Sequence, residues 1–210
     1  MAEISKSILE IQRIFRLVVC EIWGIAYEQS YSRIRFPWGS QVDTPGGTGS
    51  APDWTRDEDV CFIYALPHDN SYNRQRDRRY EHRGSRDLVA LDEHTDVHHM
   101  MFSNYGPNAY DCARRIRDGL FLDETRRILK QNHFAIITDT PAIRRVPELV
   151  NGEWWNRVDA VAAFNEFVRL ESKMRTFERF PFTVSSPGRA GYLQGGAEVS
   201  RKQHPRKEEE

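Results

Sequence analysis

The sequence has few cysteines, few lysines and no long apolar run, and each shortage argues against a class of protein. Its three cysteines, Cys20, Cys61 and Cys112, are odd in number and lack Cys-x-x-Cys spacing, which argues against a disulfide framework or a zinc finger. No apolar run approaches the roughly 18 residues that a transmembrane helix requires. The N-terminal "MAEISKSILEIQRIF" mixes charges into its apolar residues, unlike a signal peptide. We therefore expect a soluble protein made in a reducing cytoplasm.

The charge of the chain is nearly balanced. Its 210 residues carry a net charge of −1, so it lacks the overall basic field that is typical of nucleic-acid-binding domains. Only five of the 30 basic residues are lysine. The planar guanidinium of arginine suits interfaces and bidentate pairing with carboxylates, although codon bias in a GC-rich genome would give the same composition. The length fits one domain, or one domain with appendages.

Motifs that carry chemistry are also scarce. The glycines of "PGGTGS" match neither a P-loop nor a dinucleotide-binding motif, and there is no nucleophile elbow. The best candidate is "DEHTDVHHM", in which His94, Asp96, His98 and His99 are possible metal ligands. On a strand, His98 and His99 would point to opposite faces, so at most one of them could join His94 and Asp96. We predict no catalytic residue, no metal and no cofactor, with a metal-dependent enzyme using His94, Asp96 and His98 as an alternative.

A helix is predicted from about Ser5 to Trp23. Its apolar residues recur at intervals of three and four on one stripe: Ile4, Ile8, Ile11, Phe15, Val18 and Ile22. Ser7 and Glu10 fit a capping box, and Gly24 can end the helix. The opposite face carries polar residues, which are Gln12, Arg13 and Arg16.

Short apolar runs alternate with irregular segments further along the chain. The stretch 38–59 is rich in Gly, Ser and Pro and is predicted to be a long loop. Residues 72–94 are predicted to be an arginine-rich arm, which could form a charged hairpin. Strands are predicted at Val60–Leu66, Thr95–Tyr105 and residues 133–139, and helices at residues 108–120 and 123–131.

The motif Tyr105-Gly106-Pro107-Asn108 joins a predicted strand to a predicted helix. Gly106 and Pro107 break the strand, and Asn108 is a favoured N-cap residue. We therefore assign these four residues a structural role.

The stretch from Leu149 to Glu171 can be read as a strand or as a helix. Asn151-Gly152 is the strongest short signal for a β-hairpin, and a turn of that type must return an antiparallel partner. One strand face would carry Val158, Ala160, Ala162, Phe164, Val168 and Leu170, interrupted only by Glu166. Because apolar residues also align at helical spacing, the helix stays open for residues 157–171, and the strand is favoured.

These elements describe an α+β fold, with an antiparallel β-sheet flanked by α-helices on one face. We expect a single domain over residues 1–174, with residues 38–94 containing the loop and arm insertions. Residues 175–210 are expected to form an extended C-terminal tail whose end, "RKQHPRKEEE", is disordered.

Three stretches together resemble a known family. They are "SNYGPNAYDCARRIRDGL", "PAIRRVPELVNGEWWNRVDAVAAFNEF" and the N-terminal helix, and they are similar to tailed-phage neck terminator proteins, a branch of the tail terminators. The combination of YGPNAYD, RRVPEL and W-x-x-R-V-D is more specific than each motif alone. The resemblance covers mainly residues 95–171. Residues 38–94 and the tail after Met174 do not match the family pattern, so their roles stay open.

The resemblance implies a structural virion protein at the neck–tail junction, assembled in the host cytoplasm. Family members are expected to form a six-membered ring that caps the head-proximal end of the tail tube, stops tube growth and joins the tail to the neck. The implied partners are further copies of the chain, the tail tube protein, a neck or head-completion protein (adaptor or stopper) and possibly the sheath. DNA would pass through the ring without sequence-specific binding.

Arginine and tryptophan are enriched at protein interfaces. The partner-interface candidates are therefore Arg74, Arg76, Arg78, Arg79, Arg144, Arg145, Trp154 and Trp155. The second alternative function is a nucleic-acid-binding module that uses the arginine-rich arm at residues 74–86.

Overall fold

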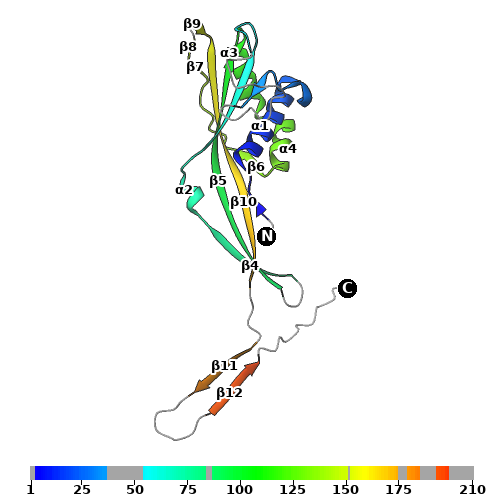
Figure 1. Ribbon diagram of the computed structural model, residues 1–210, viewed down its shortest axis with the longest axis vertical. Helices are drawn as coiled ribbons and strands as arrows, with labels where there is room; N and C mark the ends of the chain where they lie inside the picture. The colour runs from blue at the N-terminus through cyan, green and yellow to red at the C-terminus, as the bar shows by residue number, and fades with distance from the viewer. Residues whose placement is uncertain are drawn as a thin grey trace.

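The computed structural model describes residues 3–36, 54–83, 87–150, 152–174, 179–184 and 193–198. It confirms the α+β class, with the three longest helices on one face of a mostly antiparallel sheet (Figure 1). The helices are α1 (Ile8–Trp23), α2 (Ser71–Arg74), α3 (Ala109–Gly119) and α4 (Asp123–Gln131), with one turn of 3-10 helix at Tyr27–Gln29. The main sheet contains β1 (Glu3–Ile4), β2 (Ile34–Arg35), β3 (Val60–Pro67), β4 (Asp77–Arg83), β5 (Asp87–Tyr105), β6 (Phe134–Ile136), β7 (Arg144–Arg145) and β10 (Arg157–Met174). Two separate hairpins pair β8 (Glu148–Val150) with β9 (Glu153–Trp155), and β11 (Arg179–Val184) with β12 (Leu193–Glu198).

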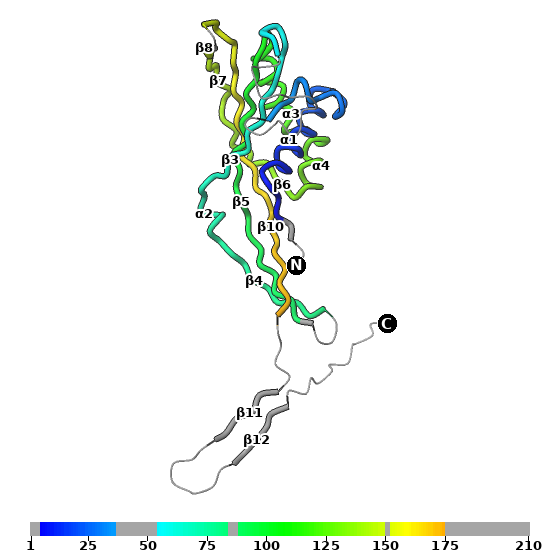
Figure 2. Tube along the Cα trace, in the orientation of Figure 1, coloured from blue at the N-terminus to red at the C-terminus, as the bar shows by residue number. Residues whose placement is uncertain are grey.

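Two long strands, β5 and β10, form the axis of the sheet (Figure 2). They pair antiparallel along their whole length, from Arg157 opposite Tyr105 to Met174 opposite Leu88. On the free edge of β5, β3 pairs with its C-terminal half and β4 with its N-terminal half. On the free edge of β10 lie β7, β6 and β1, and β2 adds to β3 in parallel. We call the half with β3 and the helices the head, and the half with β4 the arm.

The core lies in the head, between the sheet and helices α1, α3 and α4. Phe15 of α1 is fully buried and packs its ring 4.6 Å from Phe164, 5.5 Å from Phe134 and 6.3 Å from Phe102. The expected capping box of α1 is present, and Gly24 ends the helix at φ +68°. None of the helices in the described part of the chain is long and apolar enough to span a membrane.

The polar face of α1 is not entirely outward-facing, which corrects the sequence prediction. Arg16 is only 1% exposed, and its guanidinium lies 3.9 Å from the Phe36 ring and 4.5 Å from the Tyr31 ring. Gln12 is also buried and donates a hydrogen bond to the carbonyl of Ile63. The reason is tertiary: the chain after α1 folds back over this side of the helix, which helical periodicity does not reveal.

The strand reading of residues 157–171 is confirmed, and the helical alternative is wrong. Buried and half-buried side chains alternate along β10, as one face packs against the helices. The partner of β10 is β5, however, and not the strand that precedes Asn151-Gly152. That dipeptide belongs to the smaller β8–β9 hairpin, in which Gly152 has φ +83°, while Asn151 lies outside the described residues.

Several element boundaries also differ from the prediction. Strand β5 begins at Asp87 rather than Thr95, and its added residues pair with β4 in the arginine-rich arm. Strand β6 is shorter than predicted and ends at Ile136. Strands β11 and β12 occur in the C-terminal segment, where only an extended tail was expected. Most of the predicted 38–59 loop and all of residues 199–210 lie outside the described residues.

Candidate interaction surfaces

The turn between β5 and α3 requires glycine at position 106. Gly106 has φ +114°, and a Cβ there would lie 2.5 Å from the carbonyl oxygen of Glu58 and 2.6 Å from a carboxylate oxygen of Asp59. The Asp59 carboxylate accepts hydrogen bonds from the backbone N–H and the side-chain amide of Asn108, at 2.9 and 3.0 Å. Asn108 is the N-cap residue of α3, as predicted, but its side chain binds Asp59 and makes no capping bond to the helix.

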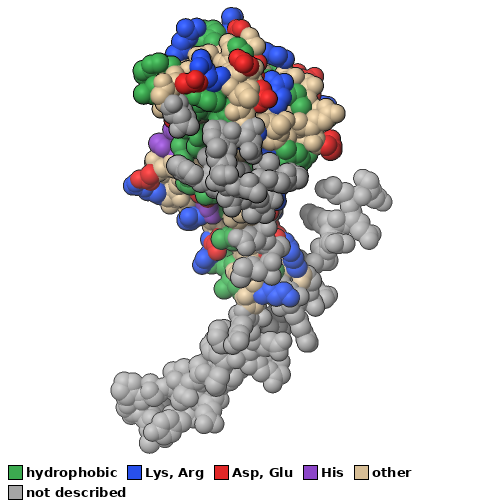
Figure 3. Space-filling model, turned by 45° about the horizontal axis from the view of Figure 1, so that its top comes forward, with side chains coloured by type: hydrophobic (Ala, Val, Ile, Leu, Met, Phe, Trp, Pro, Cys, Tyr) green, Lys and Arg blue, Asp and Glu red, His purple; other side chains and the backbone are tan. Residues whose placement is uncertain are grey.

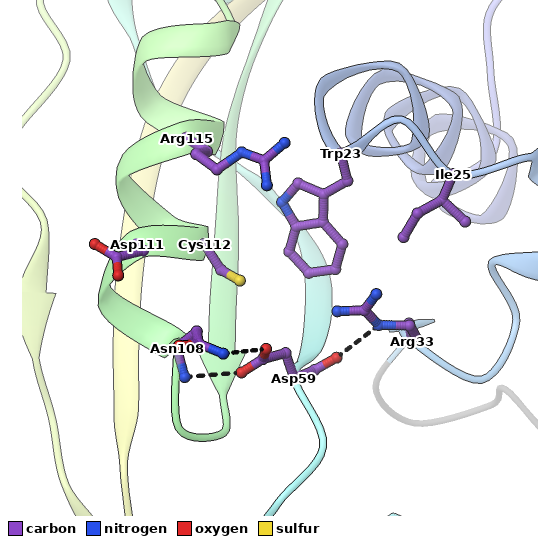
Figure 4. Close-up of a pocket in the computed structure, with 8 residues that line it drawn as sticks. All are labelled: Trp23, Ile25, Arg33, Asp59, Asn108, Asp111, Cys112 and Arg115. Atoms are coloured by element: carbon purple, nitrogen blue, oxygen red, sulfur yellow. Dashed lines mark hydrogen bonds between the residues drawn. The ribbon is translucent and has the colours of Figure 1, made fainter.

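A cavity of 260 Å³ lies beside this turn (Figure 4). Its lining residues are Trp23, Ile25, Arg33, Asp59, Asn108, Asp111, Cys112 and Arg115. Arg33 donates from Nε to the backbone carbonyl of Asp59 and places its guanidinium 5.4 Å from the Trp23 ring. Burial raises the pKa of the Cys112 thiol, so the thiol stays protonated near neutral pH and is a poor nucleophile. The polar residues around the cavity thus hold the turn in place, and they do not form a catalytic arrangement.

Arg157 is the centre of a polar cluster on the face of the sheet opposite the helices. Its guanidinium donates to Asp159 at 2.9 and 3.1 Å and to Glu148 at 3.3 Å. Burial lowers the pKa of Arg157, but the hydrogen bonds to Asp159 and Glu148 and the nearby charges of Tyr105 and Asp159 together outweigh burial and leave the pKa raised. The Tyr105 hydroxyl donates to Glu148 at 2.7 Å, and burial together with this bond raises the pKa of Tyr105. This cluster explains the R-V-D part of the W-x-x-R-V-D motif.

The two tryptophans of the β8–β9 hairpin have different environments. The Trp155 ring lies 5.9 Å from the ring of Trp54, which in turn packs 5.0 Å from Phe62 and 6.2 Å from Tyr105. Trp154, by contrast, is 65% exposed. One indole therefore attaches the hairpin to the sheet, and the other is available to a partner.

The candidate arginines of the arm are mostly paired within the chain. Arg78 makes two hydrogen bonds to Asp92, at 2.6 and 2.9 Å, and Arg79 pairs with Glu93. Arg74 pairs with Asp69 at 2.8 Å, and Arg76 is exposed.

The pairing continues across the arm to β10. Glu93 also accepts from Arg169, and Arg83 bonds Glu171 at 2.8 and 3.0 Å. The hydrogen bond from Arg78 lowers the pKa of Asp92, and that from Arg83 lowers the pKa of Glu171. We call these pairs the ionic ladder of the arm.

The other two candidate arginines lie at the edge of the head. Arg144 and Arg145 form β7 beside Asp159 and Val158 of β10, and both are exposed. The guanidinium of Arg145 lies 5.0 Å from the ring of Tyr110. Figure 3 shows apolar side chains at the surface of the head, interspersed with charged ones.

The histidines singled out from the sequence divide between the two faces of β5, as their adjacency predicted. On the helix-covered face, His98 Nε2 lies 2.8 Å from a carboxylate oxygen of Glu166, which also contacts Lys6 Nζ at 3.3 Å. On the opposite face, the His99 ring stacks on His68 at a centroid distance of 3.9 Å.

Sequence reasoning missed the role of Glu166, which is 2% exposed, although its place in an apolar row was the available signal. Nearby, His94 Nε2 lies 3.4 Å from Asp96. Among the residues that the structure describes, no three His, Cys, Asp or Glu side chains are grouped so that they could hold a metal ion.

The family model for the phage neck terminator protein matches residues 57–186, more than half of the chain. The match begins well before residue 95 and ends after Met174, so the prediction that the arginine-rich arm lies outside the family pattern is wrong. No curated protein matches the sequence. The chain belongs to the phage neck terminator protein family, whose members are structural proteins of the phage neck.

Proposed function

We propose that the protein forms a hexameric ring that caps the head-proximal end of the tail tube, stops its polymerisation and joins the tail to the neck. The observation that carries this proposal is the family match over residues 57–186. Its partners would be the tail tube protein and a neck or head-completion protein, and its place would be the neck–tail junction of the virion.

The surface of the head supports such an assembly. A ring of identical subunits needs two different lateral patches on each subunit, because head-to-tail contacts must close around an axis. The head exposes large apolar side chains, among them Tyr110, Leu122, Val146, Leu149 and Trp154. Exposed aromatic and aliphatic groups of this kind, next to arginines, are typical of protein interfaces.

The ionic ladder disfavours the nucleic-acid alternative. Binding to phosphates requires cations that are free to replace counterions. Arg78, Arg79 and Arg83 are matched by carboxylates of the arm itself. DNA passing through the ring would therefore meet a surface without strong sequence-independent attraction from these residues.

Phage that lack the protein provide the test. We expect filled heads and separate tails, some of abnormal length, in negative-stain micrographs of lysates. Complementation with the wild-type chain should restore joined particles. If phage without the protein carry tails of normal length joined to heads, the terminator function is wrong.

A further inference from the structure

The edge of β5 opposite β10 has a gap between its two partner strands. β3 pairs with β5 from Tyr105 to His98, and β4 pairs with it from Glu93 to Asp87. Residues 94–97 lie between these ranges, and within the described part of the chain no strand pairs with them on this edge. An unpaired stretch of strand edge presents backbone N–H and C=O groups to which another chain can add.

The connection from β3 to β4, which contains α2, lies over this gap (Figure 2). His68 donates its backbone N–H to the Val97 carbonyl at 2.9 Å, and Val97 donates its own N–H to the side chain of Asn73 at 2.9 Å. The Asn73 amide also donates to the carbonyl of His68 at 2.6 Å. Two residues of the connection thus satisfy both backbone groups of Val97, as a paired strand would. We call residues 68–75 the cover of β5.

Two stacked imidazole rings join the start of the cover to the strand. The rings of His68 and His99 are nearly parallel, at 14°, and their centroids are 3.9 Å apart. His99 is half-buried on the face of β5 that the helices do not cover, and His68 is exposed. The stack therefore holds the cover through a pair of groups that can each take up a proton near neutral pH.

Few charges surround the stacked pair. The residues beside His99 on its own strand and on the two neighbouring strands are uncharged: Leu66, Val97, Met101, Ala163 and Asn165. Tyr64 on β3 also stays neutral, because burial raises the pKa of its hydroxyl. In the cover, Asp69 and Arg74 are charged, but they pair with each other at 2.8 Å. The two histidines thus act mainly on each other.

A second proton on the pair is unfavourable. Burial lowers the pKa of His99, and the charge of His68 lowers it further. One imidazolium can stack on a neutral ring, but two positive rings at this distance repel each other. The closed cover therefore binds protons less well than the released cover, in which a histidine has its ordinary pKa of about 6.5. The closed form is stable above about pH 6.5 and loses stability as the pH falls below that value.

We propose that the His68–His99 stack is an acid-sensitive clasp, which holds the cover on β5 at neutral pH and releases it in mild acid. Release removes the hydrogen-bond partners of Val97 and exposes the edge at residues 94–97. The clasp operates within a single chain, so this inference goes beyond the proposed ring and does not depend on it.

Amide hydrogen exchange of the full chain, followed by mass spectrometry, tests the clasp. Peptides that contain residues 68–75 are compared at about pH 7.5 and about pH 5.5, on either side of the ordinary histidine pKa, after correction for the intrinsic rate. Exchange in the cover should be at least about threefold faster at the lower pH, since one proton changes an opening equilibrium by at most about tenfold per pH unit. Exchange in α1 should not change.

Substitutions of the two rings separate proton uptake from ring contact. The double variant His68→Phe with His99→Phe keeps two aromatic rings but takes up no proton, so its cover should be equally protected at both pH values. His99→Gln removes the ring as well as the proton, so its cover should exchange rapidly at both. His82→Gln, which removes an exposed histidine of β4, is the matched control and should keep the wild-type response.

Two results would overturn the clasp. One is a wild-type cover that is equally protected at both pH values. The other is an acid response that persists in the double Phe variant or in His99→Gln, because the two histidines would then not carry it. Melting temperatures at neutral pH show which variants are folded, and if the double variant does not fold, the comparison of the wild type with His99→Gln decides alone.

Discussion

The head and the arm share the same two strands but are stabilised in different ways. In the head, β5 and β10 bury apolar side chains such as Phe102 and Phe164 against α1. In the arm, β5 lies between β10 and β4, every residue of β4 is exposed, and arginine–carboxylate pairs span the strands. The register of the arm is therefore inherited from the head, because a slip of one residue would turn the apolar face of both strands towards solvent.

The stability of the head and that of the arm should therefore depend on different conditions. Apolar burial supplies most of the free energy of folding and depends little on pH. Exposed ion pairs contribute little and are screened by salt. We therefore expect the arm to be the part of the molecule that responds to solution conditions, and the head to be the part that responds to core substitutions.

The largest effect should follow Phe15→Ala. Phe15 contacts three other aromatic rings and is fully buried, so its removal should lower the free energy of unfolding by about 3–5 kcal/mol. Tyr80→Ala, on the exposed strand β4, is the matched substitution in the arm and should cost less than about 0.5 kcal/mol. Urea denaturation followed by circular dichroism measures both. Similar losses for the two variants would refute the division between head and arm.

Substitution of two glycines with positive φ should give a second, smaller difference in the free energy of unfolding. Gly106→Ala should cost on the order of 3 kcal/mol, because it adds a clash with Glu58 and Asp59 to backbone strain. At Gly152, no atom lies within 4 Å of an added Cβ, so Gly152→Ala should cost only about 1 kcal/mol, from strain alone. The same denaturation experiment compares the two losses of unfolding free energy. A larger loss for Gly152→Ala than for Gly106→Ala would show that the turn before α3 tolerates a side chain.

Much of the head could be predicted from the sequence because its signals are local. The spacing of apolar residues and the Ser7–Glu10 box specify α1, and alternation specifies β10. The burial of Arg16 could not be predicted in this way, since it depends on how Tyr31 and Phe36 fold back over the helix.

The arm and the candidate surfaces were less predictable. Asp92 and Glu93 fell in the predicted arm, before the predicted strand at Thr95, and their pairing with Arg78 and Arg169 could not be predicted because those partners come from other strands. The paired tryptophans pointed to the β8–β9 hairpin, but only tertiary contacts decide that Trp155 packs inward while Trp154 stays exposed. These contacts depend on which residues face each other across the strands, and the pattern of a single sequence does not fix that register.

The smallest effect concerns the pH dependence of the ionic ladder. Hydrogen bonds from arginine lower the pKa of Asp92 and Glu171 in the folded chain. A lowered pKa contributes stability that is present above the unfolded pKa, near 4, and that is lost as pH falls through the folded value. Amide hydrogen exchange should therefore accelerate in β4 below about pH 4, relative to its intrinsic rate, before it does so in α1.

High salt provides the control for this effect. Salt screens the exposed pairs of the ladder, so it should accelerate exchange in β4 at neutral pH, too, while leaving α1 unchanged. Equal protection of β4 at pH 3 and pH 7 would show that backbone pairing with β5, and not the ladder, holds the strand in place.

The most direct test of the neck assembly is electron cryomicroscopy of the purified chain mixed with isolated tail tubes. We predict a single six-fold ring at one end of each tube, and tubes that no longer elongate when further tube protein is added. Density along the sides of the tubes, or no density at either end together with continued elongation, would contradict the proposed capping of the tube.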